Sequence, residues 1–143
     1  MKEEDPTKPG VPPETPFEPG VTEEAVRAYD ATGNLRLAIS NALVGVKKQL
    51  YGKGPVKAKT YINDNYVFTV LEGGLTKNEE TLLAAGEHRL VREYRLRFQE
   101  SVSETITTAI EDVTKRRVLA YHSQIVFEPD RAFEIFVLEP QSQ

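Results

Sequence analysis

The spacing of apolar residues changes from helical to strand-like twice along this 143-residue chain, and this order limits the fold more than any other feature. Apolar residues recur at steps of three and four over residues 35–50 and again, mostly at steps of four, over residues 91–113, which is typical of amphipathic helices. Two short runs rich in β-branched and aromatic residues follow each segment, as expected of strands. The order helix–strand–strand–helix–strand–strand predicts an α+β fold of two αββ units, with a four-stranded antiparallel sheet covered by helices.

The first helix is predicted in two pieces. The Thr-Glu-Glu sequence at residues 22–24 is typical of a helix start, because acidic side chains are favoured near the positive end of the helix dipole. We expect a short helix over residues 23–29 and an interruption at the Thr-Gly-Asn sequence of residues 32–34. The main helix then begins at Leu35 and ends before the Gly-Lys-Gly-Pro turn of residues 52–55, since glycine caps a helix and proline prevents its continuation.

The first pair of strands is predicted over residues 56–62 and 66–72. The Asn-Asp-Asn sequence at residues 63–65 separates them, and both residue types tolerate the left-handed backbone that a tight hairpin requires. Thr76 and Glu79 then match a capping box, in which a hydroxyl and a carboxylate satisfy free backbone N–H groups at a helix start. A short helix is therefore expected after the hairpin.

The long helix is predicted over residues 87–114, after a break at Gly86. Its apolar stripe rotates slowly around the helix, because a step of four residues exceeds one turn of about 3.6 residues. A rotating stripe suits a twisted sheet better than a straight coiled-coil seam. The stripe consists of Val91, Tyr94, Phe98, Val102, Ile106, Ile110 and Val113.

The last two strands are predicted over residues 117–126 and 132–138. The sequence Glu-Pro-Asp-Arg at residues 128–131 has proline at its second position and Asp after it, which predicts a type I turn. Apolar residues occupy both faces of the final strand: Phe133, Ile135 and Val137 on one face, Phe136 and Leu138 on the other.

Residues 1–21 are predicted to be a disordered, Pro-rich and acidic tail, and residues 22–143 a single domain. Six of the nine prolines lie within residues 1–20, where Phe17 is the only aromatic residue. Such a segment cannot bury enough apolar surface to offset the cost of ordering it. A linker is the simpler interpretation of the tail, and a Pro-rich docking peptide is the alternative.

The net charge of −4 belongs to residues 1–30 rather than to the rest of the chain. Residues 1–30 carry three basic and eight acidic side chains, and residues 31–143 carry fifteen basic and fourteen acidic ones. A nearly neutral domain argues against a nucleic-acid partner, which normally requires a strongly basic face. The absence of cysteine excludes disulfides and thiolate chemistry, and two histidines supply few metal ligands, so no cofactor and no metal are expected. No apolar run approaches the roughly 18 residues of a membrane helix, and we expect a cytoplasmic protein with no membrane span.

Two basic clusters are candidate sites for a small anion. Lysines surround the turn at residues 52–55, and exposed backbone amides beside lysines can hold an anion. Arginines gather with His88 near the start of the long helix, where guanidinium groups could bind a phosphate or carboxylate. The candidate anion-binding residues are Lys53, Gly54, Arg89 and Arg92. The alternatives are a plain helix stop among solvated lysines, and a solvated helix face on which Arg89, Arg92, Arg95 and Arg97 pair with nearby glutamates.

His122 and Ser123 are candidates for nucleophilic catalysis, but their positions argue against it. Successive strand residues point to opposite faces of a sheet, so the two side chains do not face each other. A catalytic His-Ser pair also requires an acid that orients the imidazole. We therefore expect no catalytic residues and a protein that is not an enzyme.

Three stretches of the chain carry a resemblance to a known family. A helix ends in Leu-Tyr-Gly-Lys-Gly-Pro at residues 50–55, the hairpin leads to Leu-Thr at residues 75–76 with Glu79 and Leu82, and the final strand ends in Phe-Val-Leu at residues 136–138. Over residues 34–139 the chain resembles the MpsC family, bacterial proteins named after a component of a sodium-translocating, membrane-potential-generating system. Within these stretches, four residues are expected to have structural roles in the turn and the capping box: Gly52, Pro55, Thr76 and Glu79.

The resemblance implies a soluble accessory protein that works with membrane subunits linked to bicarbonate uptake and ion transport, and it implies no catalytic residues. A non-enzymatic interaction protein is therefore the first hypothesis, and a small-anion-binding regulatory sensor domain is the alternative. We also expect a homodimer, joined through the sheet or through the helix at residues 87–114. A small four-stranded sheet has two edges, and one of its faces stays open if both long helices lie on one side.

Overall fold

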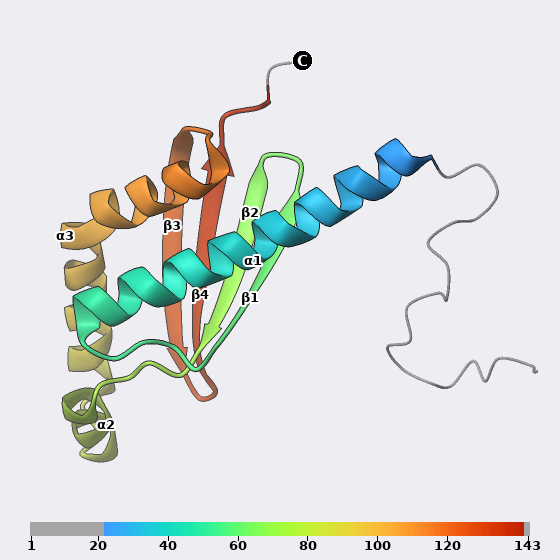
Figure 1. Ribbon diagram of the computed structural model, residues 1–143. Helices are drawn as coiled ribbons and strands as arrows, with labels where there is room; N and C mark the ends of the chain where they lie inside the picture. Colours follow the sequence, from blue (N-terminus) through green and yellow to red (C-terminus); the bar gives the residue numbers. More distant parts are fainter. Residues whose placement is uncertain (1–21, 142–143) are drawn as a thin grey trace, which may run out of the picture.

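A computed structural model describes residues 22–141, which form three helices and one four-stranded antiparallel sheet (Figure 1). The elements follow in the order α1 (Glu23–Tyr51), β1 (Lys57–Asn63), β2 (Tyr66–Glu72), α2 (Lys77–Ala84), α3 (His88–Thr114), β3 (Val118–Phe127) and β4 (Asp130–Leu138). The strand order is β1-β2-β4-β3, and every neighbouring pair is antiparallel. The predicted α+β class is confirmed. The predicted tail at residues 1–21 lies outside the described residues, as do residues 142–143.

Helix α1 runs without a break through residues 32–34, so the predicted interruption there is wrong. Neither Gly33 nor Asn34 removes a backbone N–H, and the helical hydrogen bonds therefore continue. A glycine inside a helix costs only about 1 kcal/mol relative to alanine. Packing of the helix face that carries Ile39 and Leu43, both fully buried, outweighs that cost.

The turn after α1 depends on its two glycines. Gly52 has φ +78°, a backbone region that glycine adopts without penalty, and its N–H donates to the Lys48 carbonyl at 2.9 Å. A Cβ atom on Gly54 would lie 3.0 Å from the Cβ of Lys48, so the chain passes close to the end of α1 there. The helix therefore ends where the sequence predicts, and the chain turns directly into β1.

The hairpin between β3 and β4 differs from the prediction. Strand β4 begins at Asp130, so Glu128 and Pro129 are the central residues of the turn. The peptide bond between them is cis, which places proline at the third position of a type VI turn rather than at the second position of a type I turn. The first hairpin matches its prediction, with Asp64 in the left-handed region at φ +55°.

Helices α1 and α3 both cover the same face of the sheet (Figure 1). The core lies between them and the sheet, and its fully buried members are Ile39, Leu43, Val67, Leu71, Ile106, Ile110, Phe136 and Leu138. Because side chains alternate along a strand, Phe136 and Leu138 point to the helices, and Phe133, Ile135 and Val137 point away. We call the face without helices the open face.

Three buried hydroxyl groups join α1 to the first two strands. Ser40 and Thr60 have their side-chain oxygens 2.7 Å apart, and those of Thr60 and Thr69 lie 2.9 Å apart. A hydroxyl can either donate or accept, and Thr60 takes part in both contacts, so the chain of contacts supplies each of these buried groups with a partner.

Candidate functional site

A buried lysine of α1 is the first component of the site. Lys47 follows Val46 on the face of α1 that packs on the sheet, and its Nζ lies 2.7 Å from Oε1 of Glu134. The alternation of β4 turns Glu134 to the same interior, beside Phe136. The two side chains are 7% and 0% exposed. Such burial of charge is tolerated only because the two ions neutralise each other.

The second oxygen of Glu134 accepts a hydrogen bond from β3. The hydroxyl of Tyr121 donates to Oε2 at 2.5 Å, and the Tyr121 ring stacks on Phe136 with centroids 4.7 Å apart. Burial, together with the neighbouring negative charge of Glu134, raises the pKa of Tyr121 above its usual range. The phenol therefore stays protonated and keeps donating to the carboxylate.

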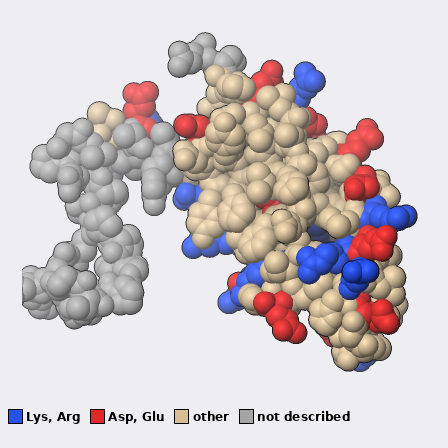
Figure 2. Space-filling model, turned by 180° about the vertical axis from the view of Figure 1, so that it is seen from behind, with Lys and Arg blue, Asp and Glu red and all other residues tan. Residues whose placement is uncertain are grey.

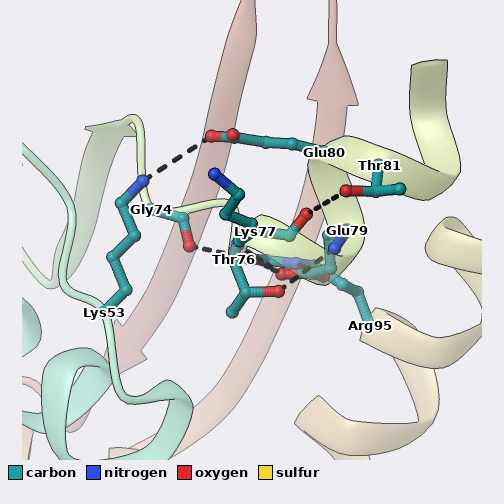
Figure 3. A network of polar contacts seen from close by, with 8 residues as sticks. All are labelled: Lys53, Gly74, Thr76, Lys77, Glu79, Glu80, Thr81 and Arg95. Carbon is teal, nitrogen blue, oxygen red and sulfur yellow. Dashed lines mark hydrogen bonds and ion pairs between the residues drawn. The ribbon is translucent and has the colours of Figure 1, made fainter.

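A second ion pair fixes the start of α2 (Figure 3). Both halves of the predicted capping box are present: Glu79 N–H donates to the Thr76 hydroxyl, and Thr76 N–H donates to the Glu79 carboxylate. Arg95 of α3 donates to both oxygens of that carboxylate and to the carbonyl of Gly74. Burial raises the pKa of Glu79, but the hydrogen bonds from Arg95 and from the Thr76 backbone outweigh it and hold the pKa below its usual range.

Arg95 therefore does not belong to a solvated helix face, as one alternative supposed. Its side chain is 11% exposed, and that of Glu79 is 4% exposed. The predicted apolar stripe is displaced at this point, because Tyr94 is 51% exposed and its neighbour Arg95 is the residue that turns inward, where α3 contacts α2. Arg97 does remain on the solvated face and pairs with Glu93 at 3.3 Å, as the glutamate alternative predicts.

Tyr51 lies between the two ion pairs. Lys47 Nζ is 5.4 Å from the centroid of the Tyr51 ring, and the guanidinium carbon of Arg95 is 4.8 Å from the same centroid. Phe98 covers the ring with a centroid distance of 4.6 Å. Burial raises the pKa of Tyr51 to about 12. The last turn of α1 thus connects the α2 start to the buried pair on the sheet.

A small cavity of about 20 Å³ opens beside this group. Cationic side chains line it, namely those of Lys47, Lys53 and Arg95, and no carboxylate does. The backbone of Gly73 and Gly74 closes it on the loop side, both with positive φ. A space of this size holds about one water molecule or a comparably small solute.

The structure gives the predicted anion-binding residues separate partners. Lys53 lies 3.6 Å from Glu80, with about half of each side chain exposed, and Gly54 packs against α1. Arg92 donates to the carbonyl of Ile125 at 3.3 Å and covers the Phe127 ring, and Arg89 is exposed. Lys53 comes together with Lys47 and Arg95 at the cavity instead.

His122 and Ser123 point to opposite faces, as expected. His122 is exposed and pairs with Ile135 on the open face, and the Ser123 hydroxyl contacts the Gln99 side chain at 2.9 Å. Within residues 22–141, no group of three or more His, Asp or Glu side chains is placed to hold a metal ion. Among the described helices, none combines the length and apolar character needed to cross a membrane.

The buried group Lys47–Glu134–Tyr121 was not predicted from the sequence, although two signals point to it. Lys47 falls on the apolar face of a helix, beside Val46 and one turn from Leu43. Glu134 occupies an inward position of a strand, two residues before Phe136. A charged residue at a core position is rarely buried unless a partner neutralises it.

Comparison with known proteins adds a family. The family model described as "Na+-translocating membrane potential-generating system (MpsC)" matches residues 31–140. No curated protein and no solved structure matches the chain.

Proposed function

This chain belongs to the MpsC family, and from that membership we propose that it is a non-enzymatic, cytoplasmic accessory protein of a sodium-translocating, membrane-potential-generating system. Its role is to bind other subunits of that system. A link to bicarbonate uptake is part of the same proposal, taken from the family resemblance.

The observation that carries the proposal is the apolar character of the open face. Tyr61, Tyr66 and Ile135 are 48%, 57% and 37% exposed, and the neighbouring Phe68 and Phe133 rings stack on each other with centroids 6.0 Å apart. Figure 2 views the molecule from the side opposite the helices. The middle of this face is a broad uncharged area, with Lys, Arg, Asp and Glu towards its margins. Contiguous exposed apolar patches of this kind are typical of surfaces that bind other proteins.

The arrangement of charges supports a binding role over a catalytic one. Lys47, Glu134, Arg95 and Glu79 neutralise one another in two pairs, and the exposed His122 stands apart from them. An active site instead requires a charged or nucleophilic group that is free to meet substrate.

Co-purification from native membranes tests the accessory role. A tagged chain is expected to retain membrane subunits of the system, and Ile135→Glu on the open face should abolish that retention. Leu37→Glu is the matched control, because Leu37 is 61% exposed on α1, away from the open face. Equal retention by the two variants, or no retention by the unmodified chain, contradicts the proposal.

The alternative is a small-anion-binding regulatory domain, with the anion held at the mouth of the cavity by the half-exposed Lys53, because the cavity itself holds only about one water molecule. The cationic lining is the observation that favours it. Calorimetry against bicarbonate and phosphate should then show binding that Lys53→Gln weakens and Lys57→Gln leaves unchanged. No heat with either anion at millimolar concentration would exclude this alternative.

A further inference from the structure

Strand β3 forms one edge of the sheet, and its part beyond the register shift between Val118 and Ala120 lacks the charged side chains and prolines that usually protect an edge strand. Its ten residues, Val118–Phe127, include no charged side chain and no proline. The opposite edge strand, β1, carries Lys57 and Lys59 within seven residues. Lysine on an edge discourages pairing with another strand, so the two edges are protected unequally.

The direction of the backbone groups along β3 follows from hydrogen bonds at the end of β4. Leu138 N–H donates to Asn65, next to β2, and Glu139 N–H donates to Arg117, next to β3. In an antiparallel strand, the N–H and C=O of one residue point to the same neighbouring strand, and those of the next residue point to the opposite side. The odd-numbered residues of β4 therefore form hydrogen bonds with β3. In the register of the pair, their partners are the even-numbered residues 120, 122, 124 and 126. The backbone groups of Tyr121, Ser123 and Ile125 therefore point outward. Arg92 donates to the Ile125 carbonyl from that side, and it must give up this hydrogen bond when another strand pairs there.

A groove of about 350 Å³ runs along this edge, between β3 and α3. Tyr121, His122 and Ser123 form one side of it, and α3 supplies the other with Leu96, Gln99, Glu100 and Ser103. Leu96 is 45% exposed there. An added strand could thus bond to β3 while its side chains pack on an apolar residue of α3.

We propose that the occupant of this groove is β3 of a second copy of the chain. Two β3 strands pair antiparallel about a twofold axis at Ser123, so that Ser123 lies opposite its counterpart and Tyr121 lies opposite Ile125 of the other copy. The two sheets join into one sheet of eight strands, and the unprotected edges are removed from solvent. This interface goes beyond the proposed accessory role and does not depend on it.

Charge around the groove favours a second copy as the partner. Arg92 lies at the Ile125 end of the groove, and Glu100 lines the end near Tyr121. The twofold axis exchanges these ends, so Glu100 of each copy faces Arg92 of the other. The same surface is therefore complementary to itself in charge as well as in backbone hydrogen bonding.

Proline at position 123 tests the interface without disturbing the sheet. Ser123→Pro removes an N–H that points outward, and the β3–β4 hydrogen bonds come from the even-numbered neighbours. Ser123→Ala is the matched control, since it removes the hydroxyl that contacts Gln99 but keeps the N–H. By sedimentation equilibrium of the full chain, the unmodified protein and Ser123→Ala are expected to be dimers at micromolar concentration. Ser123→Pro should dissociate with a dimer constant about tenfold weaker or more.

Charge reversal gives a second test that does not depend on proline being tolerated in β3. Arg92→Glu and Glu100→Arg should each weaken the dimer. Either change places two like charges opposite each other where position 92 of one copy faces position 100 of the other, and this happens twice in a twofold dimer. The double variant should restore it. A monomeric unmodified chain overturns the proposal, as does a dimer that survives Ser123→Pro in a protein of unchanged circular dichroism. A dimer lost with Ile135→Glu but kept with both charge reversals also overturns it, because that result places the contact on the open face.

Discussion

Lys47 and Glu134 meet in the interior, with Nζ and Oε1 separated by 2.7 Å, although one comes from the first helix and the other from the last strand. The pair joins α1 to the centre of the sheet, and Tyr121 extends it to β3. It is the most buried ionic contact among the described residues, and it leads to the first prediction.

Removing the lysine should strongly destabilise the fold. Lys47→Met leaves the Glu134 carboxylate buried without its cation, and we expect the free energy of unfolding to fall by about 3 kcal/mol or more. Urea denaturation monitored by circular dichroism measures the change. Lys48→Met, at the exposed neighbouring position, should change the stability by less than about 0.5 kcal/mol. The triple variant Lys47→Met, Glu134→Met and Tyr121→Phe should recover most of the loss, because it also removes the hydroxyl that would lose its acceptor. Failure to recover would mean that the charges matter less than the packing.

Stability should fall at alkaline pH through Tyr51. Its pKa is raised from 10.0 to about 12 by burial, so the folded chain resists ionisation that the unfolded chain undergoes. The stability that this provides is complete below pH 10 and is lost as the pH rises towards 12. Thermal unfolding between pH 9 and pH 12 should show a smaller decline for Tyr51→Phe than for the unmodified chain. Tyr61→Phe, on the open face, should decline like the unmodified chain.

Acid should destabilise the protein through Glu79. The pKa of this carboxyl lies below its usual value of 4.5 in the folded state, so its contribution is present above about pH 4.5 and is lost as the pH falls towards the folded value. Glu79→Gln should lower stability at pH 7 by about 2 kcal/mol, because it weakens the cap and leaves Arg95 without its counter-ion. It should also flatten the decline between pH 5 and pH 3. Glu80→Gln, whose side chain is 56% exposed, serves as the control.

Two glycine substitutions should act in opposite directions. Gly33→Ala should stabilise α1 by about 0.5–1 kcal/mol, because the position is inside a helix and an added Cβ finds its nearest atom, of Arg36, at 3.8 Å. Gly52→Ala should cost about 1 kcal/mol or more, because φ is +78° at that position. The melting temperatures of both variants, compared with that of the unmodified chain, test this prediction. A higher melting temperature for Gly52→Ala would contradict the positive φ assigned to the turn.

Periodicity predicted the order of the elements because each helix and strand buries one face, and burial leaves a local pattern. It failed at residues 32–34, where tertiary packing overrides the weak helix propensity of glycine and asparagine. It also failed at Pro129, because a local sequence does not determine the isomer of the bond before proline.

The candidate site was less predictable than the fold. Lys53 and Arg92 were grouped from clusters of like charge, but the structure gives each of them a different partner. Arg95 and Lys47 find their partners 16 and 87 residues away along the chain. Such pairs depend on the helix rotation and strand register that only the assembled sheet provides. The capping box was predictable because all of its groups lie within four residues.

The strand order β1-β2-β4-β3 has a consequence for how the chain acquires its structure. The strand that follows all the others in sequence is inserted between two of them, and it carries Phe136, Leu138 and Glu134 into the interior. Until β4 arrives, β2 and β3 have no common neighbour, and Lys47 has no counter-ion. The first hairpin and α1 can therefore associate early, but the rate at which the native core closes is set by contacts of long sequence separation. A refolding experiment should see helix form before the ring of Tyr121 reaches its stacked position on Phe136.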